Sequence, residues 1–419
     1  MKAKYQTLLK LNIMAAITLG TLSSVNAAPF VQCPGDTGNG PGNIAGDAII
    51  DETGVEFQND KCMHLAAGDG FVKMADGRLQ YMFGFSDMTG IPQGDAIEAG
   101  ILRAAYPAPT IVLDQGDEFY LSLTNVGMIM RPDLADPHTV HFHGFPNASA
   151  IFDGVPDASV SVQMGASLSY YYNLVEPGTY MYHCHVEATE HMQMGMMGNL
   201  YVKPAQNKTP AGVLLGSHLH ALNDQYVYND GDGSTLYDVE YPIQIGSFDP
   251  EFHDASLNVQ PLPFAEMKDT YPMLNGRGYP DTKNPGELTP PAESALPHAT
   301  IPGPQVVSSL ITATAGDKVL LRLSNLNITN NYTLATNGLK MKVVGIGARL
   351  HRGPGALGVA KDLYYETNSI TLGGGEAADV IIDTAGVPVG TYFLYTSNLN
   401  YLNNNEDDFG GMMTEIHIN

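Results

Sequence analysis

The stretch MYHCHVEATEHMQMGMMG, residues 181–198, concentrates side chains that bind metals. Cys184 stands between two histidines, and His191 and four methionines follow after a short spacer. The chain has only three cysteines. Cys33 and Cys62 lie in an early, loop-rich part and can pair in an oxidising compartment, which leaves Cys184 alone. A free cysteine in an exported protein needs a reason, and metal ligation is the leading one.

The first 27 residues have the features of a signal peptide. Lysines open the segment, residues 11–22 form a short apolar run, and Val25-Asn26-Ala27 offers a small-residue cleavage site. The apolar run is too short to span a bilayer comfortably, and no later stretch approaches that length. We therefore expect an exported protein, periplasmic or extracellular, with no membrane partner.

The charge balance is strongly acidic, with a formal net charge of −24. Nucleic acid is an unsuitable partner, because its phosphates need Lys and Arg to displace counterions. Cationic partners, such as metal ions or a basic redox protein, suit this charge, although solubility alone explains it equally well.

Short runs rich in Val, Ile, Tyr and Thr alternate with Gly, Pro, Asn and Asp, which predicts an all-β fold of sandwich type. The chain also repeats itself at an offset of about 200 residues. GTYMYHCH at 178–185 returns as GTYFLYTS at 390–397, and QGDEFYLSLTN at 115–125 returns as AGDKVLLRLSN at 315–325.

Two copies of one sandwich are therefore expected. Residues 28–100 are Gly-rich and weakly patterned, which favours an N-terminal extension leading into the first sandwich. The predicted organisation is a signal peptide at 1–27, this extension, a first sandwich at 101–203, a linker at 204–240 and a second sandwich at 241–419.

The second metal-binding stretch is PHTVHFHGFP, residues 137–146. Successive side chains of a strand point to opposite faces, and the same parity applies around Cys184. If the two strands are neighbours, His138 and Cys184 share one face. The other face then holds four imidazoles, those of His141, His143, His183 and His185.

The first group is completed by His191 and Met196. Two imidazoles, one thiolate and a weak axial thioether form the ligand set of a blue-copper site, and they accommodate both copper oxidation states. The four imidazoles of the other group suit further copper ions that handle oxygen. Zinc fits this collection less well. The remaining methionines, Met192, Met194 and Met197, are more often packing residues.

HTVHFHG, HCH and the ending from His191 to Met196 resemble the copper motifs of multicopper oxidases, the cupredoxin family of laccases and small two-domain laccases. FDPEFH, NGRGYPDT and GEAADVIID, at 248–253, 275–282 and 375–383, resemble second-domain segments of that family. The resemblance implies two cupredoxin-like Greek-key sandwiches, the first of which carries copper.

The resemblance also assigns roles to the ligands. It implies a type 1 copper at His138, Cys184, His191 and Met196, a type 2 copper at His141, and a type 3 pair at His143, His183 and His185. A laccase-like oxidase would take single electrons from a phenol-like reductant or a low-valent metal ion. Cys184, His183 and His185 would pass them to the second site, where O2 is reduced to water. A homo-oligomer, a trimer by analogy, is expected.

Two departures from the family pattern stand out. The spacer VEATE between His185 and His191 is longer than in ordinary laccase motifs. The family's oxygen-reducing cluster also takes histidines from a second copper-type domain, in the same chain or a neighbouring subunit. Here YTLATNG (332–338) and TSNLNYL (396–402) stand where those histidines are expected.

Two other functions stay open. A blue-copper electron carrier or copper-handling protein would explain the lost histidines, and a copper nitrite reductase is the weaker alternative. Carboxylates such as Asp153, Glu187 and Glu190 can move protons or attract cations. His218 and His220 form a second His-x-His pair, whereas a surface or core role is expected for four isolated histidines: His64, His298, His351 and His417.

Overall fold

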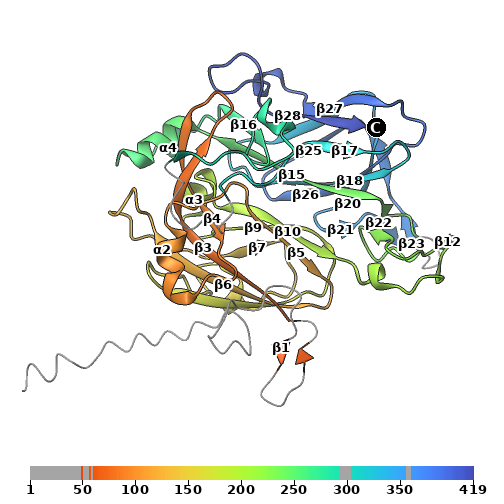
Figure 1. Ribbon diagram of the computed structural model, residues 1–419, viewed down its shortest axis with the longest axis horizontal. Helices are drawn as coiled ribbons and strands as arrows, with labels where there is room; N and C mark the ends of the chain where they lie inside the picture. Colours follow the sequence, from red (N-terminus) through yellow and green to blue (C-terminus); the bar gives the residue numbers. More distant parts are fainter. Residues whose placement is uncertain (1–48, 51–55, 58–59, 293–302, 355–359) are drawn as a thin grey trace, which may run out of the picture. The chain divides into compact units, whose positions relative to one another are not determined.

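Two β-sandwiches contain most of the strands (Figure 1). The computed structural model describes residues 49–50, 56–57, 60–292, 303–354 and 360–419. The expected signal peptide and Cys33 lie outside these ranges. The all-β prediction is confirmed.

The first sandwich pairs two four-stranded sheets. One sheet has the order β4-β3-β6-β8, with bounds Leu79–Asp87, Asp60–Lys73, Glu118–Gly127 and Ser167–Asn173. The other has the order β5-β10-β9-β7, with bounds Ala108–Asp114, Met197–Lys203, Gly178–His183 and His141–His143.

The second sandwich has a seven-stranded and a five-stranded sheet. The larger sheet has the order β16-β15-β18-β26-β20-β21, with β24 also on β20; the bounds are Tyr271–Leu274, Val239–Phe248, Lys318–Asn325, Glu376–Asp383, Met341–Ile346, Arg349–Leu350 and Tyr365–Thr367. The smaller has the order β17-β28-β27-β19-β25, with bounds Ile311–Ala313, Met413–Ile418, Gly390–Thr396, Tyr332–Thr336 and Ser369–Leu372.

Short elements connect these sheets. Within the described residues the α-helices are α2 (Ala96–Gly100), α3 (Ala188–Gln193) and α4 (Pro250–Leu257). Two-stranded pairs are β1-β2 (Ile49–Ile50, Glu56–Phe57), β11-β12 (Leu214–Leu215, His218–Leu219), β13-β14 (Gln225–Tyr226, Leu236–Tyr237) and β22-β23 (Arg352–Pro354, Ala360–Asp362). Short 3-10 turns lie at Gln93–Asp95, Ala150–Phe152, Ala205–Lys208, Phe264–Glu266, Asp281–Lys283 and Leu399–Tyr401. None of the helices in the described ranges has both the length and the apolar character needed to cross a membrane.

Residues 60–87 belong to the first sandwich itself. The sequence placed them in an extension that leads into the sandwich, because their glycines weaken the strand pattern. In the structure, β3 pairs with both β4 and β6 and so forms the interior of a sheet. Gly70 and Gly84 face Ala104 and Ala105 so closely that larger side chains would clash. These glycines allow close packing rather than marking a loop.

Strand β9, which leads to Cys184, is buried along its whole length. It lies between β10 and β7, and the second sandwich covers its outer face through contacts such as Thr179 with Asp379. Beneath it, Phe142 stacks on Tyr172 at a centroid distance of 4.0 Å. A strand covered on both faces shows no polar alternation. This packing gives the copper motifs a rigid base.

A buried polar cluster joins the two sandwiches around Arg322, which is 0% exposed. Its Nε donates to Glu240 (2.8 Å) and its Nη1 donates to Thr179 (3.1 Å). The carboxylate of Asp379 lies 3.5 Å from Nη1 and accepts hydrogen bonds from Thr179 and Tyr228. Burial of these charges is tolerated because each has partners.

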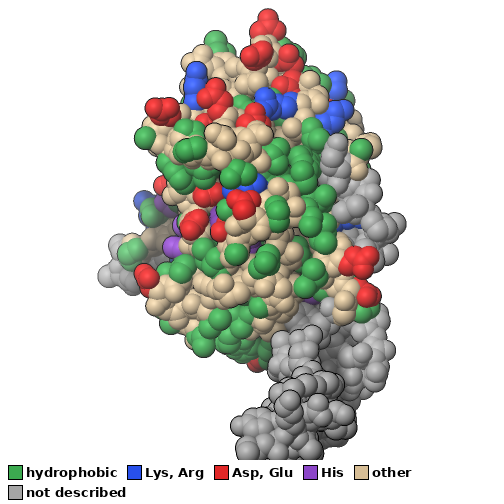
Figure 2. Space-filling model, turned by 90° about the vertical axis from the view of Figure 1, so that its left-hand side faces the viewer, with side chains coloured by type: hydrophobic (Ala, Val, Ile, Leu, Met, Phe, Trp, Pro, Cys, Tyr) green, Lys and Arg blue, Asp and Glu red, His purple; other side chains and the backbone are tan. Residues whose placement is uncertain are grey.

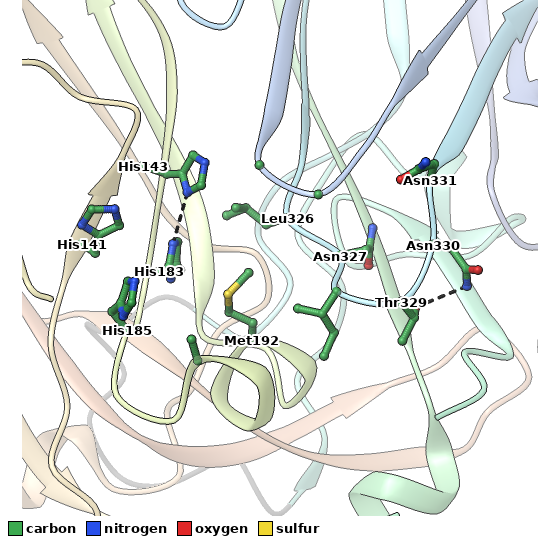
Figure 3. A pocket seen from close by; sticks show the side chains of 14 residues that line it. His141, His143, His183, His185, Met192, Leu326, Asn327, Thr329, Asn330 and Asn331 are labelled. Atoms are coloured by element: carbon green, nitrogen blue, oxygen red, sulfur yellow. Dashed lines mark hydrogen bonds between the residues drawn. The ribbon is translucent and has the colours of Figure 1, made fainter. Parts of the chain in front are cut away.

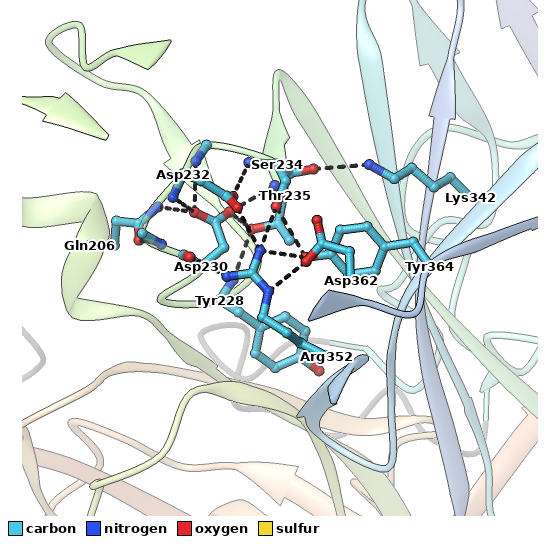
Figure 4. A network of polar contacts seen from close by, with 12 residues as sticks. Gln206, Tyr228, Asp230, Asp232, Ser234, Thr235, Lys342, Arg352, Asp362 and Tyr364 are labelled. Carbon is cyan, nitrogen blue, oxygen red and sulfur yellow. Dashed lines mark hydrogen bonds and ion pairs between the residues drawn. The ribbon is translucent and has the colours of Figure 1, made fainter. Parts of the chain in front are cut away.

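The 204–240 segment is held against the second sandwich by a second polar network (Figure 4). Arg352 donates from Nε to Asp362 (2.5 Å) and from Nη2 to Asp232 (2.8 Å). Lys342 donates to the carbonyl oxygen of Ser234 at 3.2 Å. The segment expected as a linker is therefore fastened to the second sandwich around residues 232–234.

Replacing Arg322 with Leu should lower the free energy of unfolding by about 3–5 kcal/mol, because Asp379 would keep a buried charge without its cation. Lys340→Ala is the control, since the pair of Lys340 with Glu366 is exposed and its loss should change the free energy of unfolding far less. Urea unfolding measures both values. Equal effects of the two substitutions would contradict the role of Arg322.

His253 on α4 should make stability depend on pH. Its Nδ1 lies 2.5 Å from the carbonyl oxygen of Tyr81 and its Nε2 3.0 Å from that of Gln193. Burial lowers the pKa of His253 to about 4. The unfolded chain therefore binds this proton first, and the contribution of His253 is complete above about pH 6.5 and lost as the pH falls toward 4.

For the metal-free protein, the loss attributable to His253 should approach about 3 kcal/mol, the value of a shift of this size. Unfolding titrations between pH 7 and pH 4 on wild type and His253→Gln measure it. The stability difference between the two proteins should shrink as the pH falls. A difference that stays constant over this range would contradict the assignment.

Candidate metal centre

The pairing of β7 with β9 brings the two histidine motifs together. His141 lies opposite His183, and His143 lies opposite Met181. Cys184 and His185 follow directly after the end of β9, and the chain then enters α3, which carries His191. The expected neighbouring of the two motif strands is confirmed, and with it the sorting of side chains onto two faces.

Three of the four members of the first group, His138, Cys184 and His191, lie together. The sulfur of Cys184 lies 3.2 Å from Nδ1 of His191 and 3.8 Å from Nδ1 of His138. All three residues are 0% exposed, and Cys184 is a free thiol, whereas Cys62 is disulfide-bonded. One ligand atom from each lies within 4.8 Å of the others. This is a closed pocket with one sulfur and two imidazole nitrogens.

Met196, the fourth member of the first group, lies beside these three residues. Its side chain is buried in the same apolar cluster as Cys184. Its carbonyl oxygen accepts a hydrogen bond from the Cys184 N–H (3.1 Å), and its own N–H donates to His191 (2.9 Å). The backbone of Met196 is thus hydrogen-bonded to the backbones of Cys184 and His191.

The electrostatics of this group favour a thiolate. Burial opposes ionisation of Cys184, but the adjacent His191 and His138 lower its pKa well below the usual value. Burial likewise disfavours charge on His191, yet the Cys184 thiolate and the carboxylate of Asp136 raise its pKa to about 10. These interactions favour an ionised Cys184 beside a charged His191. The thiolate is the form of cysteine that binds metals.

The second group consists of His141, His143, His183 and His185. One ring nitrogen each from the first three lies within 4.8 Å of the others. The ring centroid of His185 lies 5.2 Å from that of His141 and 5.6 Å from that of His183. The structure therefore brings all four together on the face opposite to Cys184.

Hydrogen bonds determine which ring nitrogens of these histidines are free to bind a metal. Nδ1 of His141 donates to the carbonyl oxygen of Asp153 (2.6 Å), and Nδ1 of His183 donates to that of Cys184 (2.8 Å). Each bond fixes the tautomer that leaves Nε2 with a lone pair. Nδ1 of His143 lies 3.4 Å from Nε2 of His183, so these nitrogens face one another.

Two imidazoles of the second group, those of His183 and His143, are shifted toward the neutral form. Burial, together with a smaller contribution from the neighbouring histidines, lowers the pKa of His183 to about 3, although its hydrogen bond to Cys184 opposes the shift. Burial, followed by His141 and His185, lowers the pKa of His143 as well. Copper binds only the unprotonated ring, so these shifts prepare the residues for ligation.

A cavity of about 520 Å³ opens in front of these histidines. Figure 3 shows the four imidazoles on one side and a wall from the second sandwich on the other. That wall comprises residues 326–331 with Gly374 and Gly375, and Met192 lies between the two sides. No histidine lines the wall in the described part of the chain. On the face drawn in Figure 2, histidine side chains reach the surface.

The two groups fit copper to different degrees. The thiolate, two imidazoles and thioether of the first group match a blue-copper ligand set. The four imidazoles of the second group suffice for one or two copper ions. The further histidines that a trinuclear cluster requires are missing from the opposite wall, so within the described residues the complete cluster does not fit.

The acidic residues singled out from the sequence lie in different places. Asp153 contacts His141, with Oδ1 3.5 Å from Nδ1. Glu187 is exposed at the start of α3, and Glu190 is buried, which raises its pKa. Asp136, which the sequence analysis missed, lies 3.8 Å from Nε2 of His191. The sequence offered one indication that Asp136 lies near the first group, because it stands two residues before His138.

The sequence analysis also missed a contact between the second sandwich and residues 188–196, which we call the copper loop because they carry His191 and Met196. Gln193, the last residue of α3, donates to Asp269 at 3.2 Å. Asp269 also accepts hydrogen bonds from Ser247 and Thr329, and burial raises its pKa. Because Thr329 lines the cavity, Asp269 connects the copper loop to the cavity wall. No short motif in the sequence marks this contact.

Four further histidines have hydrogen-bond or ion-pair partners outside the two histidine groups. His218 bonds Asp224 (2.7 Å) and His220 bonds the hydroxyl of Tyr226 (2.9 Å) within the 204–240 segment. His64 is buried and bonds Thr124 (2.8 Å), and His417 pairs with Glu415 (2.7 Å). His298 lies outside the described residues.

Comparison with known proteins gives the family. Two multicopper oxidase family models match residues 93–207 and 264–417, together more than half of the chain. The laccase abr2 of Aspergillus fumigatus is 25% identical over 237 residues, covering 53% of this chain and 36% of the laccase. The chain thus spans about a third of that relative's length.

Two further comparisons concern smaller copper proteins. A copper-containing nitrite reductase of Pseudomonas chlororaphis is 29% identical over 150 residues, covering 34% of this chain and 38% of the reductase. The solved structure of a blue copper oxidase from Nitrosomonas europaea shares the fold, with a TM-score of 0.58, 20% identity and 85% coverage of each chain. With cupredoxin-type sandwiches and matching models over both halves, the chain belongs to the multicopper oxidase family.

Proposed function

We propose that the chain is a laccase-like copper oxidase that takes single electrons from a small reductant and delivers them to O2. The reductant is a phenol-like molecule or a low-valent metal ion, and the first group, His138, Cys184, His191 and Met196, holds the copper that accepts the electrons. Bound copper would supply one-electron redox chemistry at the first group and oxygen binding at the second.

The observation that carries this proposal is that Cys184 contacts both histidine groups, each through a different atom. Its thiol lies in the first group, while its carbonyl oxygen accepts a hydrogen bond from His183 of the second group. His183 and His185 are its peptide neighbours. Cys184 therefore joins the two sites by a few covalent bonds and provides a short route for electrons.

The residues around the second group support a role in oxygen chemistry. Asp153 and Cys184 offer carbonyl oxygens that orient two imidazoles, and the cavity leaves room for a small molecule in front of them. The carboxylate of Asp153 lies 3.5 Å from Nδ1 of His141 and its side chain is 33% exposed, so it is placed to carry protons between solvent and the second group. We also propose export to the periplasm or the exterior, and a homo-oligomer in which a neighbouring chain completes the ligand set.

An electron carrier is the second candidate, and the cavity wall favours it. Within the described residues this wall offers Asn, Thr and Gly where the family supplies histidines. Such a protein would keep the first group and lose oxygen reduction. Nitrite reduction is a third possibility, supported by the similarity to the Pseudomonas reductase.

Copper content and oxygen uptake separate these functions. Copper per chain is measured by elemental analysis, and oxygen consumption is followed with a phenolic substrate and with ferrous ion. An oxidase should bind copper beyond the first site and consume oxygen. A single copper without uptake would overturn the proposal in favour of a carrier, and consumption of nitrite in place of oxygen would favour a reductase.

Replacing Cys184 with Ser should abolish the intense visible absorption band of a blue-copper site, because that site needs the thiolate ligand. His220→Gln is the matched control, because His220 is equally buried but contacts Tyr226 instead of the copper groups. Its copper-loaded form should keep the band. Survival of the band in Cys184→Ser would contradict the assignment of the first group.

A further inference from the structure

The second sandwich touches the second histidine group at a glycine. Residues 373–375, between β25 and β26, are three consecutive glycines. A methyl group added at Gly375 would lie 2.7 Å from Nε2 of His143 and 3.0 Å from its Cε1. Gly375 also has a φ of +88°, which favours glycine. Its backbone thus approaches the imidazole more closely than any other residue type allows.

We infer that Gly375 is a positioning residue for the second copper site, acting through His143. The inference rests on the proposed function only in taking His143 as a copper ligand. The glycine backbone lies against the Nε2 edge of the ring, and Nδ1 is turned toward His183 at 3.4 Å. Contact of Gly375 with the Nε2 edge of the His143 ring therefore keeps Nδ1 facing the position where the metal would bind.

The glycine loop is fixed, so it acts as a wall for the ring. The N–H of Gly375 donates to the carbonyl oxygen of Asn325 (2.8 Å), and the Asn325 side chain donates to Leu372 (2.8 Å). The N–H of Gly373 donates to Glu376 at 2.6 Å. A methyl group at Gly374 would lie 2.3 Å from the carbonyl oxygen of Asn327, so the loop has no room to retreat on that side.

A side chain at position 375 must therefore displace His143. Its ring is partly exposed toward the cavity and is the movable partner in the contact. Loss of a group that orients a metal ligand typically weakens metal binding about 10–100-fold. The first group lies on the other face of the strands, so its copper should be unaffected.

The test compares Gly375→Ala with Gly386→Ala and Gly316→Ala. The two controls have φ values of +77° and +105°, which bracket that of Gly375, and both lie in open space. They reproduce the backbone strain without the contact to His143. Gly375→Asn repeats the test with less strain, because Asn tolerates a positive φ.

Two measurements follow. In copper titrations, Gly375→Ala should bind second-site copper about 10–100-fold more weakly than the controls while keeping the first-site absorption band. In metal-free crystals, the His143 ring should be displaced in Gly375→Ala and Gly375→Asn only. An unmoved His143 would overturn the inference whatever the copper content. A wild type that binds copper only at the first site contradicts the proposed function instead.

Discussion

The position of one buried sulfur governs the arrangement of both metal groups. Cys184 follows a strand in which alternate side chains point to opposite faces, and β7 pairs with that strand so that His141 lies opposite His183. The thiol therefore meets His138 and His191, while its two peptide neighbours turn to the other side. A slip of one residue in this pairing would turn the histidines of β7 to the opposite faces and separate the thiol from His138.

The packing of β9 explains why this register is secure. The strand is central and fully buried, its lower face rests on an aromatic cluster, and its upper face contacts the second sandwich through Thr179. The second sandwich carries no copper motif, yet it contacts the metal-binding part at several points. Asp269 holds Gln193 beside the first group, and Gly375 lies against His143 beside the second. Through these contacts the second sandwich acts as a scaffold for the ligands of the first.

The sequence predicted the all-β fold, the repeat and both histidine groups, because strand parity and motif spacing are local properties. It did not predict that residues 60–87 form the inner strands of a sheet, because glycines there serve close packing that depends on distant partners. Asp269 and Gly375 were missed for the same reason. Their contacts join residues far apart in the chain, and nothing in their immediate sequence indicates the partner. The glycine triplet alone hinted at a close backbone approach.

The most direct measurement is a crystal structure of the copper-loaded protein with anomalous scattering recorded at the copper edge. One anomalous peak should lie bonded to the Cys184 sulfur and to Nδ1 of His138 and His191, with at least one more among His141, His143 and His183. A structure in which Cys184 carries no copper, or in which all the copper lies on one face of β9, would contradict the account.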